Sequence, residues 1–206
     1  MTIYLYNMQG LRFRKRTRRR NCKRDLCPGK GEDTMKKLFA LILAVAMMLG
    51  CTALADNEIN WEDVAPAVEA AGITGDFYTF EEIALAIFVP TGMVDSELPD
   101  DSYIGYFAAE DGSALAVQYV KMDDVDLDTY AATLESVGAT EIEKGTLNGL
   151  PCVSYEVPAN KTVNVAFATE EGYILEAVCG PVESEDDKTG AAMILSSIQA
   201  YYGDEE

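Results

Sequence analysis

The sequence "YIGYFAAEDGSALAVQYVK", residues 103–121, contains the clearest structural pattern of the chain. Two β-prone runs, 103–109 and 114–121, flank a short polar segment. Asp111 and Gly112 in that segment tolerate the positive φ angles of a tight hairpin turn. The pattern predicts an antiparallel β-hairpin in the middle of the chain.

Further strands are expected on both sides of this hairpin. The runs 76–80 and 83–89 predict a strand pair that stops at Pro90, and a polar, acidic loop follows over 91–102. Four more strands are expected at 140–147, 151–157, 162–168 and 173–179, the first two joined by a turn at Asn148-Gly149. Alternation of large apolar residues over 153–167 is typical of a sheet with one buried face.

Three helices are expected, at 61–70, 124–138 and 184–202. Asn60 and Ser184 are predicted to cap the first and third, and Gly138 to end the second. The side chains expected to face the core are Leu127, Tyr130, Leu134 and Val137 of the second helix and Ile194, Leu195, Ile198 and Tyr201 of the third.

Because strands and helices do not alternate one for one, the order predicts an α+β fold, with an antiparallel sheet of about six or seven strands and the helices on one face. A strand ending in "FVP", a hairpin, a central helix, a run ending in "EGYILEAVCG" and a closing helix with "ILSSI" together resemble the PsbP-like fold over roughly residues 76–202. The resemblance implies a small exported bacterial protein with a binding or accessory role. It transfers no functional residues.

An export signal is expected at residues 35–55. Lys36 and Lys37 precede an apolar run of about twelve residues, shorter than the ~20 that span a bilayer, and an Ala-Leu-Ala cleavage pattern ends at Ala55. Residues 56–206 are then a single mature domain. The Arg-rich residues 1–34 are interpreted as a translated leader upstream of the true start, the alternative being a basic arm that binds nucleic acid.

A second processing route is open at Cys51. The sequence Met48-Leu49-Gly50-Cys51 resembles the box at which bacterial lipoproteins are cleaved and lipidated on cysteine. Cys51 is therefore a candidate lipid attachment site, and the protein is expected to be secreted or extracytoplasmic, either free or anchored through that residue.

The predicted mature part is strongly acidic. Residues 56–206 hold four lysines, no arginine and 32 Asp or Glu residues, a net charge of −28. This charge excludes a phosphate-backbone partner, so no nucleic acid is expected, and it disfavours anionic membrane surfaces. A cationic or neutral protein or peptide partner fits, as does weak association with calcium. No transmembrane segment is expected after signal cleavage.

The residue inventory argues against catalysis. The chain has no histidine, which is the commonest general base and a common metal ligand. The mature part also lacks arginine, and with it the bidentate clamp for carboxylates and phosphates. No catalytic residue, metal site or cofactor is predicted.

Cys152 and Cys179 are the two cysteines of residues 56–206. An exported compartment permits a disulfide between them. In a three-stranded meander they would lie at opposite ends of the sheet, roughly 20 Å apart at ~3.3 Å per residue, beyond the ~7 Å that a disulfide allows. Two separate thiols are therefore expected.

Two acidic runs precede predicted helices. Asp124, Asp126 and Asp128, with Glu135, have the spacing of a calcium loop, but Thr129 replaces its essential glycine. Helix capping is the favoured interpretation, and the same holds for Glu183-Ser184-Glu185-Asp186-Asp187.

Other candidates are paired carboxylates and aromatic residues. Glu81-Glu82 and Asp100-Asp101 have the chemistry of a glycosidase pair, with acidic loops as the favoured interpretation. Trp61 is a candidate for partner contact. The aromatic residues that either line a ligand groove or fill the core are Tyr78, Phe80, Tyr103, Tyr106 and Phe107.

The function expected from the sequence is that of an exported, non-enzymatic accessory or binding domain. Two alternatives are a surface protein anchored through Cys51 and an exported carboxylate-dependent hydrolase. The hydrolase requires two carboxylates that converge in a pocket, one of them with a raised pKa.

Overall fold

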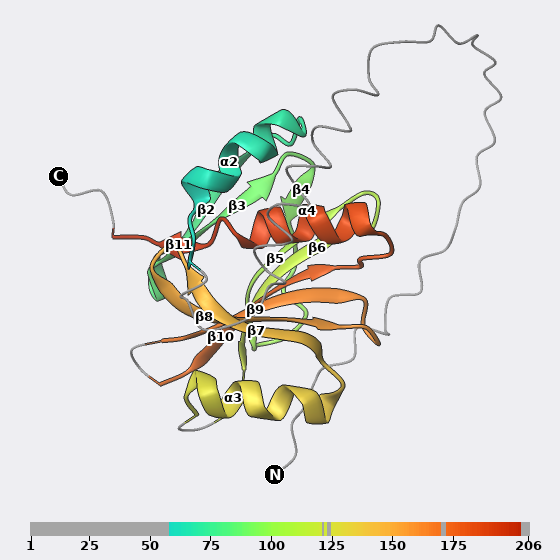
Figure 1. Ribbon diagram of the computed structural model, residues 1–206. Coiled ribbons are helices and arrows are strands. Elements are labelled where there is room, and N and C mark those ends of the chain that lie inside the picture. Colours follow the sequence, from blue (N-terminus) through green and yellow to red (C-terminus); the bar gives the residue numbers. More distant parts are fainter. Residues whose placement is uncertain (1–57, 121, 123–124, 170–171, 203–206) are drawn as a thin grey trace, which may run out of the picture.

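A large sheet runs through the middle of the molecule (Figure 1). The structure is a computed structural model that describes residues 58–120, 122, 125–169 and 172–202. Within these residues the sheet has eight strands. In sheet order they are β1 (Glu58–Ile59), β7 (Thr140–Leu147), β8 (Leu150–Val157), β9 (Thr162–Ala168), β10 (Ile174–Gly180), β6 (Ala114–Val120), β5 (Tyr103–Ala109) and β4 (Met93–Asp95). All neighbours pair antiparallel except β1 and β7, which are parallel.

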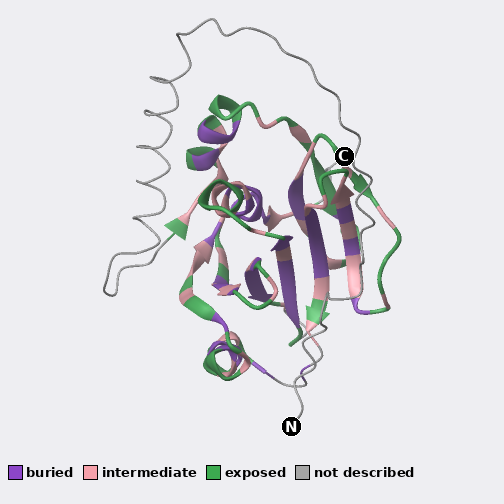
Figure 2. Ribbon diagram, turned by 90° about the vertical axis from the view of Figure 1, so that its right-hand side faces the viewer, coloured by how far each residue is buried: buried purple, intermediate pink, exposed green. Residues whose placement is uncertain are grey.

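A smaller sheet and the helices cover this sheet on both sides. The smaller sheet contains β11 (Gln199–Ala200), β3 (Leu85–Pro90) and β2 (Gly75–Phe80). Helix α3 (Leu127–Leu134) lies on one side of the large sheet, and α4 (Glu185–Leu195) lies on the other, with α2 (Trp61–Ala70) further out (Figures 1 and 2). The α+β class is confirmed. The prediction of one antiparallel sheet of about six or seven strands with the helices on one face is wrong in its details, because within the described residues the large sheet has eight strands, one pair in it is parallel, a second sheet is present and the helices lie on both sides.

Two apolar clusters explain why both faces are covered. On the α4 side, Phe107 and Leu115 of the hairpin pack with Ile87 of β3 and Leu195 of α4. On the α3 side, Tyr130 and Leu134 pack on the sheet; the sheet residues there include Val153, Tyr155, Val157, Ala166 and Ile174. Strands buried on both faces are almost continuously apolar, so simple alternation does not describe them.

The large apolar residues of 153–167 divide between the two faces. Val153 pairs with Ala166 across β8 and β9, so odd positions of one strand share a face with even positions of the next. Val153 consequently faces α3, whereas Val165 packs in the cluster on the α4 side. The half-buried sheet predicted from alternation is therefore incorrect.

The hairpin of β5 and β6 is confirmed. Gly112 has φ 94°, a conformation that favours glycine at this turn. Gly105 has a different role, because a Cβ atom there would lie 2.5 Å from Cε1 of Phe80. The close packing of the small sheet on β5 depends on that missing side chain.

Several predicted boundaries shift. Helix α3 continues into a 3-10 turn, Glu135–Val137, and ends at Gly138 with φ 85°. A second 3-10 turn, Glu81–Ile83, joins β2 to β3. The short strand β4 lies in the predicted loop 91–102, and Asn60 occupies the N-cap position of α2 without a side-chain hydrogen bond.

Helix α4 ends at Leu195, earlier than the predicted 202. The Ser196 and Ser197 hydroxyls donate to the carbonyls of Met193 and Ile194, and the Ser197 hydroxyl also accepts a hydrogen bond from Phe88 N at 2.8 Å. These bonds turn the chain toward β3, where it pairs as β11.

Asn148, in the turn between β7 and β8, joins three distant segments. Its Oδ1 accepts from Trp61 N at 2.5 Å, while its Nδ2 donates to the Ser196 and Ile198 carbonyls at 2.9 and 2.6 Å. Its φ of 48° suits asparagine better than most residues. The side chain therefore fixes the start of α2 and the end of α4 against the large sheet.

Candidate functional site

An apolar cleft of about 220 Å³ lies between α4 and strands β7, β8 and β9, on the side of the sheet opposite α3. Gly145 pairs with Cys152 across β7 and β8, and both line the cleft. Because Gly145 has no side chain, the sheet leaves space beside the Cys152 thiol. The apolar residues around this space are Ile59, Leu147, Val163, Val165, Ala192 and Leu195.

Charged side chains surround the cleft. Lys188 of α4 forms a hydrogen-bonded ion pair with Glu156 of β8. The hydrogen bond to Glu156 is the main reason that the pKa of Lys188 is raised. Among the described residues, no ion pair involves Glu141 or Glu143 of β7. The charge of Glu141 also helps to raise the pKa of Lys188. The cleft therefore has one direct ion pair, and Glu141 and Glu143 make none of their own within the described part of the chain.

The conformation of β7 places these two carboxylates. The register between β7 and β8 shifts between Thr140 and Glu143, and Glu141 adopts φ 52° within this irregularity. Burial raises the pKa of Glu143, and the negative charge of Glu141 raises it further. The irregular end of β7 thus presents two mutually repelling carboxylates beside an apolar cleft.

Lys144, which lies between Glu143 and Gly145 in the sequence, forms its ion pair on the other side of the sheet. Its Nζ lies 2.7 Å from Oδ1 of Asp128 on α3. Both side chains are more than half exposed, so the pair contributes little stability. Its charge is nevertheless directed to the α3 side of β7 and away from Glu141 and Glu143.

The two described cysteines are separate thiols, as predicted. Cys152 lines the cleft, and Cys179 is buried on β10 within the same apolar cluster. Burial raises the pKa of Cys152 to about 11 and that of Cys179 to about 12. A thiolate is the reactive form of cysteine, so neither side chain is an activated nucleophile at neutral pH.

A buried carboxyl on the opposite face was not predicted from the sequence. Glu176 of β10 accepts hydrogen bonds from Nε2 of Gln118 at 2.6 Å and from the Tyr155 hydroxyl, which lies 2.8 Å from the Tyr130 hydroxyl of α3. Burial raises the pKa of Glu176 to about 7, against the lowering effect of the Gln118 hydrogen bond. A glutamate within the apolar run "YILEAVC" was the sequence signal for this network.

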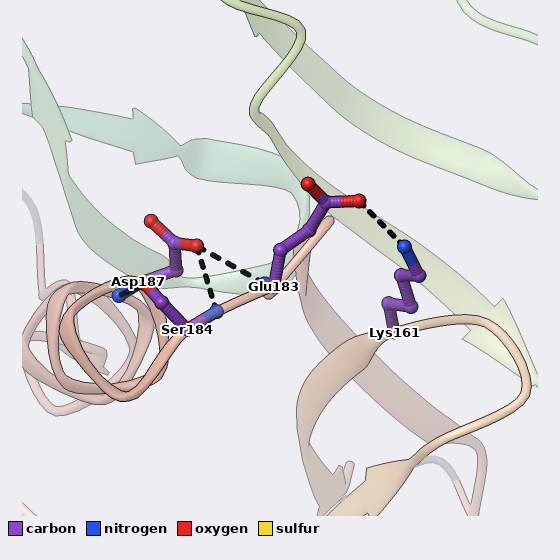
Figure 3. Close-up of polar contacts among 4 residues, drawn as sticks. All are labelled: Lys161, Glu183, Ser184 and Asp187. Carbon is purple, nitrogen blue, oxygen red and sulfur yellow. Dashed lines mark hydrogen bonds and ion pairs between the residues drawn. The ribbon is translucent and has the colours of Figure 1, made fainter.

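The acidic runs before α3 and α4 act as helix caps. Asp126 accepts from Thr129 N at 2.7 Å, and Asp124 lies outside the described residues. At α4, Ser184 and Asp187 form a reciprocal capping box, and Glu183 forms an ion pair with Lys161 at 2.5 Å (Figure 3). In the described part of the chain, no group of three or more His, Cys, Asp or Glu residues is placed to hold a metal ion.

The paired carboxylates proposed from the sequence do not line the cleft. Glu81 and Glu82 are exposed on the 3-10 turn between β2 and β3. Asp100 accepts hydrogen bonds from the backbone and hydroxyl of Ser102, and the neighbouring Asp101 is exposed. The carboxylates that do line the cleft, Glu141, Glu143 and Glu156, were not singled out from the sequence.

The five aromatic candidates are divided between the two faces of the sheet. Phe80 and Phe107 are buried in the core on the α4 side, with Tyr78 packed on both at centroid distances of 4.9 Å. Tyr103 and Tyr106 pair with each other and lie opposite Gln118 and Ala116 in the register. The core interpretation is correct for two of them, and the five do not form one groove.

Trp61 is half-buried at the start of α2. Its ring lies 5.7 Å from that of Phe77 and 5.5 Å from that of Phe88. These contacts join α2 to the small sheet, so the side chain has a packing role there.

No family model and no curated protein matches the chain. Among the solved structures that resemble it is cyanobacterial PsbP (CyanoP) from Synechocystis sp. PCC 6803, at 13% identity and a TM-score of 0.45, covering 63% of this chain and 94% of that one. The Ran-binding protein Mog1p of Saccharomyces cerevisiae gives 12% identity and a TM-score of 0.35, covering 62% and 96%. The PsbP-like resemblance expected from the sequence is confirmed at this distance, and it carries no functional conclusion.

The helices of the described residues are all too short or too polar to cross a membrane. The predicted leader at 1–34, the signal peptide at 35–55 and Cys51 lie outside the residues that the structure describes.

Proposed function

We propose that this protein is an exported, non-enzymatic binding domain that holds an apolar side chain of a peptide or protein partner in the cleft between α4 and β7–β9. The observation that carries the proposal is the cleft itself, an apolar space of about 220 Å³ with charged groups at its rim. An apolar site with a few placed polar groups is the usual form of a binding site.

The size of the cleft supports a small anchor. Cavities of about 150 Å³ accommodate benzene, whereas pockets for drug-sized ligands span about 300–1,000 Å³. The space between α4 and β8 therefore suits one aromatic or branched aliphatic group. Burying such a side chain stabilises a complex by about 1.5–3 kcal/mol, a typical contribution from a single anchor residue.

The hydrolase alternative has less support. Neither Glu81-Glu82 nor Asp100-Asp101 lines the cleft, and Glu156 is paired with Lys188. Burial and Glu141 raise the pKa of Glu143, but these two carboxylates are two positions apart on one strand, whereas a glycosidase pair flanks the scissile bond from two sides. The two thiols near the cleft are held protonated at neutral pH by burial.

Export and anchoring are part of the proposal and rest on residues 35–55. Cleavage after Ala55 would release the domain, whereas cleavage before Cys51 would leave a lipid-modified N-terminus. The intact mass of protein from the medium and from the membrane fraction distinguishes the two. A mature protein that retains the Arg-rich residues 1–34 would contradict export by this signal.

The binding proposal is tested with a random-peptide display library selected on the native protein. Ala192→Phe places an aromatic ring in the cleft, and Ala132→Phe makes the same change on the exposed side of α3. We expect the enriched peptides to share an apolar anchor, to bind the Ala132 variant and to lose binding to the Ala192 variant. Peptides that bind both variants equally, or no enrichment over a blank surface, would refute it.

A further inference from the structure

We infer that the cleft recognises a basic peptide, in which an apolar side chain fills the space over Gly145 and Cys152 and an adjacent lysine or arginine lies between Glu141 and Glu143. This inference rests on the proposed function and names the chemistry of the partner.

The charges at the rim give the first reason. Lys188 is paired with Glu156, and Lys144 with Asp128 on the opposite face. Glu141 and Glu143 have no ion pair within the described residues. Lys188 attracts Glu141 at longer range, but it is engaged by Glu156. A cation placed by the partner between Glu141 and Glu143 would offset their mutual repulsion and make the direct ion pairs that they do not make within the described part of the domain.

The position of these carboxylates beside the cleft gives the second reason. Both line the same space as Leu195, Val165 and Cys152. A bare metal ion would use the carboxylates but leave the apolar surface exposed to water. A group that combines an apolar side chain with a neighbouring ammonium or guanidinium uses both features.

The charge of the whole domain gives the third reason. Residues 56–206 carry four lysines against 32 acidic residues. A field of this sign accelerates encounter with a basic partner and disfavours an acidic one. The cleft then supplies the local specificity that a diffuse negative surface lacks.

The native cysteines provide the readout. Cys152 lines the cleft, whereas Cys179 lies on β10 outside the cleft lining. Both thiols are buried and have raised pKa values, so alkylation by excess N-ethylmaleimide is slow and is followed over hours at pH 8.5. An occupant should slow alkylation of Cys152 more than that of Cys179, which reports the stability of the whole domain. Peptide mass spectrometry measures both in the full chain, so the other cysteines do not interfere.

Three synthetic probes separate the contributions: acetyl-Lys-Phe-Lys-amide, acetyl-Glu-Phe-Glu-amide and acetyl-Lys-Ala-Lys-amide. We expect the first to protect Cys152 and to bind at least tenfold more tightly than the other two at 0.15 M NaCl. Its affinity should fall about five- to tenfold in the double variant Glu141→Gln, Glu143→Gln, because two screened ion pairs of moderate strength are lost.

The matched control is Glu81→Gln, Glu82→Gln, which changes the net charge equally at exposed positions away from the cleft. It should leave affinity within about twofold, as expected for screened charges. Thermal melts of both double variants verify folding. Equal affinity of the Lys-Phe-Lys probe for both double variants would overturn the inference. It would also be overturned if the wild type bound the Lys-Ala-Lys probe as tightly as the Lys-Phe-Lys probe.

The failure of the inference differs from the failure of the proposed function. If both Phe-containing probes protect Cys152 equally, and Ala192→Phe abolishes both effects, the cleft binds an apolar group without charge selection and the basic partner is refuted. If neither protects Cys152 and no displayed peptide depends on Ala192, the cleft is not a binding site and both proposals fail.

Discussion

Replacing Glu176 with glutamine should make the protein more stable at pH 8 and remove part of its pH dependence. The side chain is 4% exposed and lies on β10 under α3. The groups around it are Gln118 on β6, Tyr155 on β8, Tyr130 on α3 and Tyr103 on β5 with its neighbour Asp100. The first two donate hydrogen bonds, and none of these neighbours is a cation.

The magnitude follows from the pKa. Burial raises it from 4.5 to about 7 in the folded protein. Between these values the folded state holds more protons at this site than the unfolded state, so the free energy of unfolding falls as the pH rises from 4.5 to 7. Above pH 7 the full cost of the buried charge, about 3 kcal/mol, is present. Glutamine has similar shape and no charge, so it avoids that cost.

The assay is thermal and urea unfolding of Glu176→Gln and wild type between pH 5 and pH 8. We expect the variant to gain up to about 3 kcal/mol relative to wild type as the pH rises across this range, or about 6–12 °C in Tm for a domain of this size. Glu110→Gln removes one carboxylate from the exposed end of the β5–β6 hairpin and controls for net charge. A difference between Glu176→Gln and wild type that does not change with pH would refute the reasoning.

Three further predictions concern stability and are measured by urea unfolding. Asn148→Ala removes three hydrogen bonds and should lower the free energy of unfolding by about 2–4 kcal/mol, because each bond contributes about 1 kcal/mol and its backbone partner is left without a hydrogen bond. A change below about 1 kcal/mol would contradict the linking role of Asn148. Ser184→Ala removes the N-cap of α4 and should cost about 1 kcal/mol; an unchanged midpoint would show that the cap is dispensable. Gly105→Ala should destabilise the protein by about 1–3 kcal/mol, because the added Cβ would meet Phe80. Gly190→Ala, in open space on α4, should stabilise it by about 0.5–1 kcal/mol. If both substitutions changed the free energy of unfolding in the same direction, the packing described would be contradicted.

Local patterns in the sequence were sufficient to predict most elements of the fold. The Asp111-Gly112 and Asn148-Gly149 turns fixed two hairpins, because each dipeptide allows the positive φ angles that a tight turn needs. Ser184 marked the start of α4 for a similar local reason. These signals depend on a few neighbouring residues, so a single sequence contains them.

The arrangement of layers could not be predicted in the same way. Small and polar residues such as Cys152 and Ala166 looked like the exposed half of an alternating strand, but both are buried. Which face receives α4 depends on the path of the chain after β10 and on the Ser197 contact with Phe88, 109 positions away. Such long-range contacts leave no local periodicity.

The candidate site was missed because it depends on a pairing. Gly145 and Cys152 are unremarkable separately, but the register of β7 and β8 places them opposite each other in the lining of the cleft. Glu143 similarly acquires its raised pKa from burial and from Glu141 across an irregular stretch of β7. Glu176 was more accessible to prediction, since a charged residue inside an apolar strand is itself a signal of an unusual environment.

The position of Asn148 has a consequence for the order of assembly. During synthesis this asparagine is added about fifty residues before Ser196 and Ile198, so its amide remains hydrated until those carbonyls are present. Helix α2 and the central hairpins can form earlier, but the contacts that Asn148 makes with the segment after α4 form only once that segment has been synthesised. A truncation that removes the last turn of α4 and everything after it would therefore leave an open, protease-sensitive intermediate, although most of the β-strands would still be present.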